Sequence, residues 1–133
     1  MKSYPLQKLA HAMSGSLLQG GEDCVISAGV STDTRCLPAG AMFFALKGEN
    51  FDAHHFLAEA VEAGAGALVL QDDSDLPEGI PVILVNDTLK ALQALAKWYR
   101  GELGIPVVAI TGSNGKTSTK DYTHSVLSQK FRV

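Results

Sequence analysis

The chain has 133 residues, of which 46% are hydrophobic and 19% are charged, and its mean hydropathy is +0.10. This composition is typical of a folded domain and unlike that of a disordered polypeptide. The net charge of -3 argues against a nucleic-acid-binding protein, which usually carries a clustered basic face. The sequence has neither an apolar run of the roughly 20 residues that a membrane span needs nor a signal-peptide pattern. We therefore expect a cytoplasmic protein.

Patterns typical of short helices and strands follow one another in the first half of the chain. Ser3 and Gly15 can cap and end a short helix, which is predicted by apolar residues at helical spacing: Leu6, Leu9, Ala10 and Met13. The stretch 17–30 is rich in glycine and β-branched residues and predicts one or two strands, whereas the polar stretch 31–35 predicts a turn. Residues 41–46 are continuously apolar, which indicates a strand buried on both faces of a covered sheet.

Helical and strand patterns alternate in the second half. Residues 54–64 read as a helix, and the apolar runs 67–70 and 81–85 predict two further strands. Asp87 is placed to cap a long helix whose apolar positions recur at helical intervals: Leu89, Leu92, Ala96 and Tyr99. Residues 106–110 predict another buried strand. Strands that alternate with helices indicate an α/β fold.

Residues 111–118, with the sequence Thr-Gly-Ser-Asn-Gly-Lys-Thr-Ser, carry the most specific chemistry. Glycine at 112 and 115 lets backbone N–H groups converge on phosphate oxygens, which a side chain would obstruct. Lys116 would place its ammonium on the β- and γ-phosphates of ATP, and the Thr117 hydroxyl would ligate Mg²⁺. The predicted ATP-binding residues are Gly112, Ser113, Asn114, Gly115, Lys116, Thr117 and Ser118, with Lys116 also the predicted catalytic residue.

This loop departs from the common pattern G-x-x-x-x-G-K-[ST], because Ile110 stands where the first glycine would be. Its context supports a phosphate loop, since a predicted strand precedes it and a helical pattern starts near Lys116. The apolar face of that helix, within 119–129, would comprise Tyr122, Val126 and Leu127. The alternative is a glycine-rich turn that happens to contain a lysine.

A phosphate loop works inside a sheet of several strands, and only residues 131–133 lie beyond the predicted helix. We therefore expect the chain to be the N-terminal piece of a larger protein. Its predicted organisation is a domain at 1–86 and the start of a second, ATP-binding domain at 87–133.

Three blocks of sequence resemble the Mur ligases, the ATP-dependent amide-forming enzymes of peptidoglycan precursor synthesis. The blocks are 30–35 with 38–40, 43–48 continuing into 51–56, and 110–120. The similarity is greatest to the MurF type, which joins D-Ala-D-Ala to UDP-MurNAc-tripeptide. The resemblance implies a small N-terminal α/β domain with a mixed sheet, followed by the first strand, phosphate loop and helix of a central P-loop domain.

In the family, the first two blocks bind the UDP end of the substrate. Carried over by position, the implied contacts lie in the first block and in the loop 48–54: Ser31, Asp33, Arg35, Gly48, Asp52 and His54. Ala53 departs from the glycine usual in the family. The residues by themselves allow a second interpretation, in which Asp33 and Arg35 form a surface ion pair and His54 merely begins a helix.

The implied reaction is activation of the tripeptide carboxylate by ATP to an acyl phosphate, from which the amine of D-Ala-D-Ala displaces phosphate. We expect a monomer, with Mg²⁺ held by Thr117 and ATP, and we expect this chain alone to lack ligase activity and to bind ATP weakly or not at all. The alternatives are a MurE-type amino-acid ligase and a non-catalytic nucleotide-binding module. Ser113, Thr119 and Lys120 favour the MurF type over the MurE type.

Overall fold

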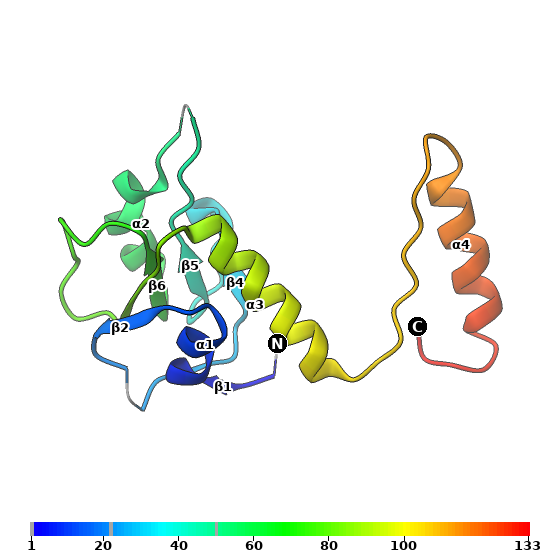
Figure 1. The fold of residues 1–133 in the computed structure, drawn as a ribbon, viewed down its shortest axis with the longest axis horizontal. Helices are drawn as coiled ribbons and strands as arrows, with labels where there is room; N and C mark the ends of the chain where they lie inside the picture. The colour runs from blue at the N-terminus through cyan, green and yellow to red at the C-terminus, as the bar shows by residue number, and fades with distance from the viewer. Residues whose placement is uncertain (1, 22, 50) are drawn as a thin grey trace. The chain divides into compact units, whose positions relative to one another are not determined.

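The computed structural model describes residues 2–21, 23–49 and 51–133, which form two compact units, Met1–Leu103 and Gly104–Val133 (Figure 1). The predicted boundary at 86/87 lies earlier than the division between these units. The reason is packing, because the long helix that follows Asp87 buries Ala91 and Leu95 in the core of the first unit.

The first unit is built on a five-stranded mixed sheet with the strand order β2-β7-β6-β5-β4. Its strands are β2 (Ser16–Gln19), β4 (Val30–Ser31), β5 (Met42–Phe44), β6 (Ala67–Leu70) and β7 (Val82–Leu84). Neighbours from β4 to β7 run parallel, whereas β2 pairs with β7 in the antiparallel sense. A small second sheet pairs β1 (Tyr4–Pro5) with β3 (Val25–Ile26). The predicted α/β fold with a mixed sheet is confirmed.

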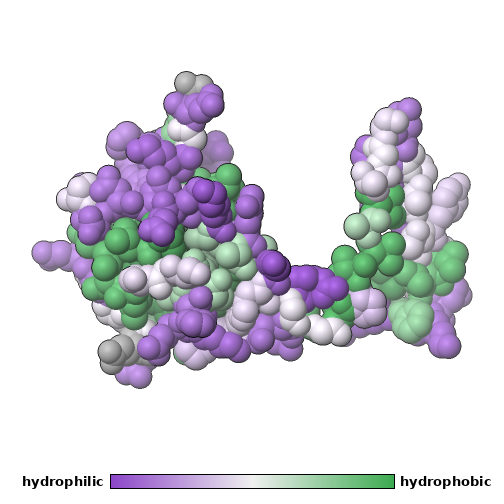
Figure 2. Space-filling model, viewed as in Figure 1, coloured by the Kyte–Doolittle hydropathy of each residue, from purple (hydrophilic) through white to green (hydrophobic). Residues whose placement is uncertain are grey.

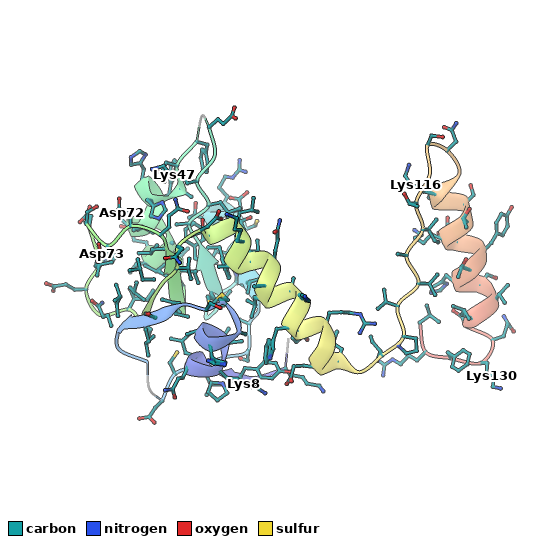
Figure 3. All side chains as sticks on the ribbon, in the orientation of Figure 1. Lys8, Lys47, Asp72, Asp73, Lys116 and Lys130 are labelled. Atoms are coloured by element: carbon teal, nitrogen blue, oxygen red, sulfur yellow. The ribbon has the colours of Figure 1, made fainter. Side chains whose placement is uncertain are left out.

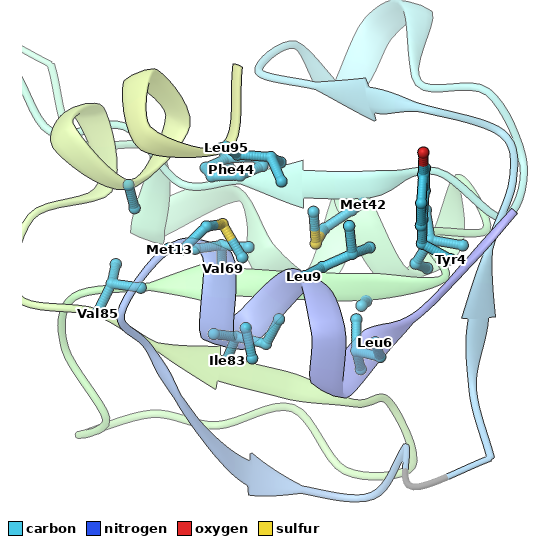
Figure 4. Close-up of a cluster of buried hydrophobic side chains, with 14 residues drawn as sticks. Tyr4, Leu6, Leu9, Met13, Met42, Phe44, Val69, Ile83, Val85 and Leu95 are labelled. Atoms are coloured by element: carbon cyan, nitrogen blue, oxygen red, sulfur yellow. The ribbon is translucent and has the colours of Figure 1, made fainter. Parts of the chain in front are cut away.

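Helices cover both faces of this sheet. On one face, α1 (Leu6–Ala12) and α3 (Thr88–Leu103) contribute to a buried cluster that includes Phe44 and Val69 (Figure 4). On the other face, α2 (Leu57–Glu62) packs in a second cluster that includes Phe43 and Leu68. Adjacent residues of one strand thus enter opposite clusters, as strand geometry requires. The prediction that the apolar run 41–46 holds a strand buried on both faces is confirmed.

The observed ends and buried faces of the helices differ in part from the predicted ones. Ser3 does not cap α1, because Tyr4 and Pro5 pair with β3 and the helix begins directly after them without a side-chain cap. Asp87 does cap α3, since its Oδ1 accepts the backbone N–H of Lys90 at 2.9 Å. The buried face of α3 agrees with the predicted one in part. Leu92 and Tyr99 pack against the core as predicted, whereas Leu89 and Ala96 are exposed. The fully buried residues of the helix are Thr88, Ala91 and Leu95.

The second unit consists of an extended segment, the glycine loop and α4 (Lys116–Leu127). The prediction of a buried strand at 106–110 is wrong for this structure, because those residues have no strand pairing and Val108 is 66% exposed. The physical reason is the lack of a partner, since the described part of this unit contains no other strand. The helix starts at Lys116 as predicted, but Tyr122 and Val126 on its apolar face are exposed.

Many apolar side chains are exposed on the surface of the second unit (Figure 2). The exposed large hydrophobic residues there are Ile105, Val107, Val108, Tyr122, Val126, Phe131 and Val133. None of the helices in the described part of the chain has the length and apolar character that crossing a bilayer demands.

Candidate functional site

The first predicted block folds into a compact turn at the end of β4. The Oγ of Ser31 accepts the backbone N–H of Asp33 at 3.2 Å and donates to its carbonyl oxygen at 3.0 Å. The Asp33 carboxylate then accepts the backbone N–H of Arg35 and so caps the short 3₁₀ helix Thr34–Cys36. Local side-chain hydrogen bonds of this kind favour turns, which explains why the polar stretch leaves the sheet here.

Asp33 and Arg35 form a two-pronged ion pair. Arg35 donates from Nε to Oδ1 at 2.9 Å and from Nη2 to Oδ2 at 2.6 Å. Hydrogen bonds from the Arg35 side chain lower the pKa of Asp33 from 3.8 to about 2. The arginine side chain is 87% exposed, so the pair itself adds little stability. The surface ion pair that the residues alone suggested is therefore present, and it fixes the orientation of the guanidinium.

The second predicted block is a loop held at its base by a charged pair. Asp52 accepts a hydrogen bond from the backbone N–H of His54 at 3.0 Å and caps the 3₁₀ helix Ala53–Phe56, while its Oδ2 lies 3.0 Å from Nζ of Lys47. The N–H of His54 is the leading cause that holds the pKa of Asp52 well below its usual value. Gly48 donates its N–H to the carbonyl of Phe51 at 2.7 Å. Residue 50, within the predicted loop 48–54, lies outside the described residues.

Ala53 replaces the glycine that the family resemblance leads one to expect. Its side chain is buried at 1% exposure, and among the described non-glycine residues only Ser14 has a positive φ. The position therefore does not demand glycine for its backbone conformation.

The two blocks line one pocket of about 500 Å³. Its lining residues are Thr32, Asp33, Thr34, Arg35, Phe43, Phe51, Ala53 and Phe56. Of the six predicted UDP-end residues, Asp33 and Arg35 line this pocket. Ser31, Gly48, Asp52 and His54 are not among the lining residues, and they take part in hydrogen bonds of the turn and the loop that carry them.

Phe51 and Phe56 form an aromatic surface in this pocket that was not predicted. Their rings are stacked, with centroids 5.6 Å apart and planes at 16°. They remain 56% and 38% exposed, although burial is the usual state of phenylalanine. The sequence does contain a signal for this surface, because two phenylalanines flank the polar run Asp-Ala-His-His. A search for charged site residues does not detect such a pair.

The glycine loop lies in the second unit at the start of α4. Gly112 and Gly115 have φ values of 148° and 76°, which side chains rarely adopt, and Gly115 caps the helix without a side-chain acceptor. The first intrahelical bond is donated by Thr119 to the carbonyl of Gly115, so the N–H groups of the first turn are available to an anion.

Lys116 folds back over the loop, where its Nζ donates to the carbonyl oxygen of Gly112 at 2.6 Å (Figure 3). Lys116 and Thr117 line one pocket of about 300 Å³, together with Val108, Ile110 and Lys120. Ser113, Asn114 and Ser118 are exposed residues of the same loop and first turn. The described residues contain no group of three or more His, Cys, Asp or Glu side chains that could hold a metal ion.

Comparison with known proteins places the chain in a family. The model of the Mur ligase family, catalytic domain, matches residues 27–100, which include both blocks around the larger pocket. The chain belongs to the Mur ligase family.

Two curated relatives differ in the reaction that they are named for. The UDP-N-acetylmuramoyl-tripeptide–D-alanyl-D-alanine ligase of Bacillus subtilis strain 168 is 48% identical over 130 residues, which cover 96% of this chain and 28% of that protein. The UDP-N-acetylmuramoyl-L-alanyl-D-glutamate–2,6-diaminopimelate ligase of Geobacter sulfurreducens is 42% identical over 103 residues, covering 76% and 20%. The chain thus spans less than a third of the length of either relative.

Two solved structures share the fold. A crystal structure of MurF from Acinetobacter baumannii matches with a TM-score of 0.87 and 33% identity, over 99% of this chain and 29% of that one. MurF ligase from Thermotoga maritima in complex with ADP matches with a TM-score of 0.65 and 32% identity, over 76% of this chain and 23% of that one.

Proposed function

We propose that this chain is the N-terminal part of an ATP-dependent ligase that joins D-Ala-D-Ala to UDP-MurNAc-tripeptide in peptidoglycan precursor synthesis. The observation that carries the proposal is the 48% identity with the Bacillus subtilis ligase of that name, because the 130 aligned residues run through both pockets. The use of ATP is supported by the ADP complex of the Thermotoga maritima relative.

The pocket of the first unit fits the UDP end of the substrate. A pyrimidine can stack on the exposed faces of Phe51 or Phe56, and such stacking contributes about 1–3 kcal/mol per base. The guanidinium of Arg35, oriented by Asp33, suits the diphosphate. Ser31, Gly48 and Asp52 then support these groups through the hydrogen bonds that hold the turn and the loop.

The glycine loop of the second unit fits a triphosphate. Two glycines with positive φ, the open first turn of α4 and the ammonium of Lys116 surround the same loop. When bound, ATP supplies the phosphoryl group that activates the tripeptide carboxylate for attack by the amine. In this proposal the loop backbone and Lys116 bind and orient the phosphates, and Thr117 contributes a hydroxyl to Mg²⁺.

This assignment divides the functions between the two units. We propose that the first unit recognises the UDP end and that Gly104–Val133 begins the ATP-binding domain, with α3 as the connection that packs on the first unit. A cytoplasmic enzyme is proposed with it, since ATP and UDP-linked precursors are its substrates, and a monomer is proposed as its oligomeric state. Sedimentation of the complete protein measures its mass in solution and tests whether it is a monomer.

A MurE-type ligase is the second candidate, and the Geobacter sulfurreducens relative is the observation in its favour. The test is ADP release by the complete protein that carries this sequence. We expect release to require both UDP-MurNAc-tripeptide and D-Ala-D-Ala. Release with UDP-MurNAc-dipeptide and a free amino acid would instead establish the second candidate, and no release with either pair would leave only a nucleotide-binding module.

A further inference from the structure

His54 stands where three segments of the first unit meet. Its side chain is 13% exposed, with Nδ1 2.6 Å from Oδ1 of Asp52 and Nε2 3.2 Å from the backbone nitrogen of Gln71. A backbone N–H can only donate, so Nε2 must accept this hydrogen bond. The ring proton therefore resides on Nδ1, from which it is donated to Asp52.

Both hydrogen-bonding positions of the ring are used inside the protein. A neutral imidazole offers one donor and one acceptor, and the partners here are Asp52 and Gln71. A ligand could form a hydrogen bond with the His54 ring only by displacing one of them. The geometry thus favours an indirect role for His54 over a direct hydrogen bond to the UDP group.

The network continues beyond the imidazole on both sides. Asp52 also holds Lys47 at 3.0 Å, and the two residues form a bridge that closes the base of the loop carrying Phe51. The side-chain oxygen of Gln71 accepts from both N and Oγ1 of Thr88 at 3.2 Å, and Thr88 is the 1% exposed first residue of α3. The imidazole therefore ties the loop to the end of β6 and, through it, to α3.

We propose that His54 is a positioning residue of the UDP pocket, which holds the Asp52 carboxylate and with it the loop that presents Phe51. It acts as a neutral imidazole protonated on Nδ1 and does not contact the ligand. The role in ligand binding rests on the proposed function, whereas the tautomer and its two partners are properties of the chain by itself.

The first test concerns the unliganded chain. Nitrogen NMR of the labelled protein at mildly alkaline pH should give His54 a protonated Nδ1 and an unprotonated Nε2. His55, which is exposed, serves as the internal reference for an imidazole in solvent. A His54 ring protonated on Nε2 would overturn the proposal without reference to any ligand.

The second test measures UDP affinity by calorimetry. His54→Ala should weaken binding about tenfold, whereas His54→Asn should retain most of the affinity because its amide nitrogen can still donate to Asp52. His55→Ala is the matched control and should bind as the unaltered chain does. Equal losses in the alanine and asparagine variants, or no loss in either, would overturn the positioning role.

The two tests separate this proposal from the function on which it rests. An unaltered chain that shows the Nδ1-protonated ring but has no affinity for UDP overturns the proposed function, and the ligand role of His54 falls with it. A chain that binds UDP equally well with and without the His54 imidazole overturns the role of His54 alone.

Discussion

Both units of the chain contain an apolar pattern typical of a strand, but only the pattern in the first unit forms one. Residues 42–44 form a strand buried between two neighbours and covered on both faces, whereas residues 106–110 stay extended and exposed. The difference lies in the partners and not in the local sequence, because strands are stabilised by cross-strand hydrogen bonds and by packing of both faces. The first unit supplies both within its own residues, and the second does not.

The largest expected effect concerns chemistry that depends on the second unit. In the complete protein, Lys116→Ala should lower the rate of ADP release about 10³-fold, because in the proposed function this substitution removes the positive charge that binds the phosphates. Lys130→Ala, beyond the end of α4, is the control and should leave the rate unchanged. A Lys116→Ala variant with nearly full activity would contradict the assignment of the glycine loop.

Core truncation tests whether stability resides in the first unit. Phe44→Ala should reduce the free energy of unfolding by about 3–5 kcal/mol, since the side chain is fully buried and its loss leaves a cavity. Val108→Ala in the second unit should change it by less than about 0.5 kcal/mol. Urea denaturation measures both, and comparable losses in the two variants would abolish the contrast between the units.

The aromatic surface of the pocket should matter for binding and little for stability. Phe51→Ala is expected to weaken UDP binding by about 1–3 kcal/mol, because the stacking of the base on this ring is lost. The stability of the fold should change little, because the Phe51 side chain is largely exposed. The control is Phe131→Ala, an equally exposed phenylalanine of the second unit. Calorimetry that finds the same UDP affinity in both variants would remove the stacking surface from the site.

The smallest effect concerns the exposed ion pair. Because the folded pKa of Asp33 lies near 2, below its ordinary 3.8, the pair stabilises the fold above about pH 3.8 and loses this effect as the pH falls toward 2. Arg35→Ala should raise the pKa of Asp33 toward 3.8, and Arg132→Ala should not. Carboxyl NMR titration follows the change, and an unmoved pKa would show that Arg35 is not its cause.

Sequence patterns predicted those parts of the fold that depend on local composition. The run around Phe43 and Phe44 indicated a covered strand, and Asp87 indicated the start of α3. The edge of the buried face of α3 was not predictable, because the helical spacing alone does not show that Leu89 is exposed while Leu92 and Leu95 pack in the core. The predicted strand at 106–110 would need a partner strand, and no pattern within those residues shows whether one is present.

The candidate site divides in the same way. The glycine loop was predicted because its chemistry depends on adjacent residues. The pocket of the first unit could not be predicted in this way. Residues of the first block line it together with Phe51 and Phe56, because the fold brings these separate segments of the chain together. The role of His54 likewise required the position of Gln71, a residue 17 positions away whose backbone N–H occupies one ring nitrogen.

In the proposed division of functions, the first unit recognises a uridine diphosphate by itself. Calorimetric titration of this 133-residue chain with UDP measures that recognition, with GDP as the reference nucleotide of equal charge. We expect saturable binding of UDP, weaker binding of GDP, and the same UDP affinity in the Lys116→Ala variant. Absence of UDP binding by the folded chain, or equal affinity for GDP, would contradict this division of functions.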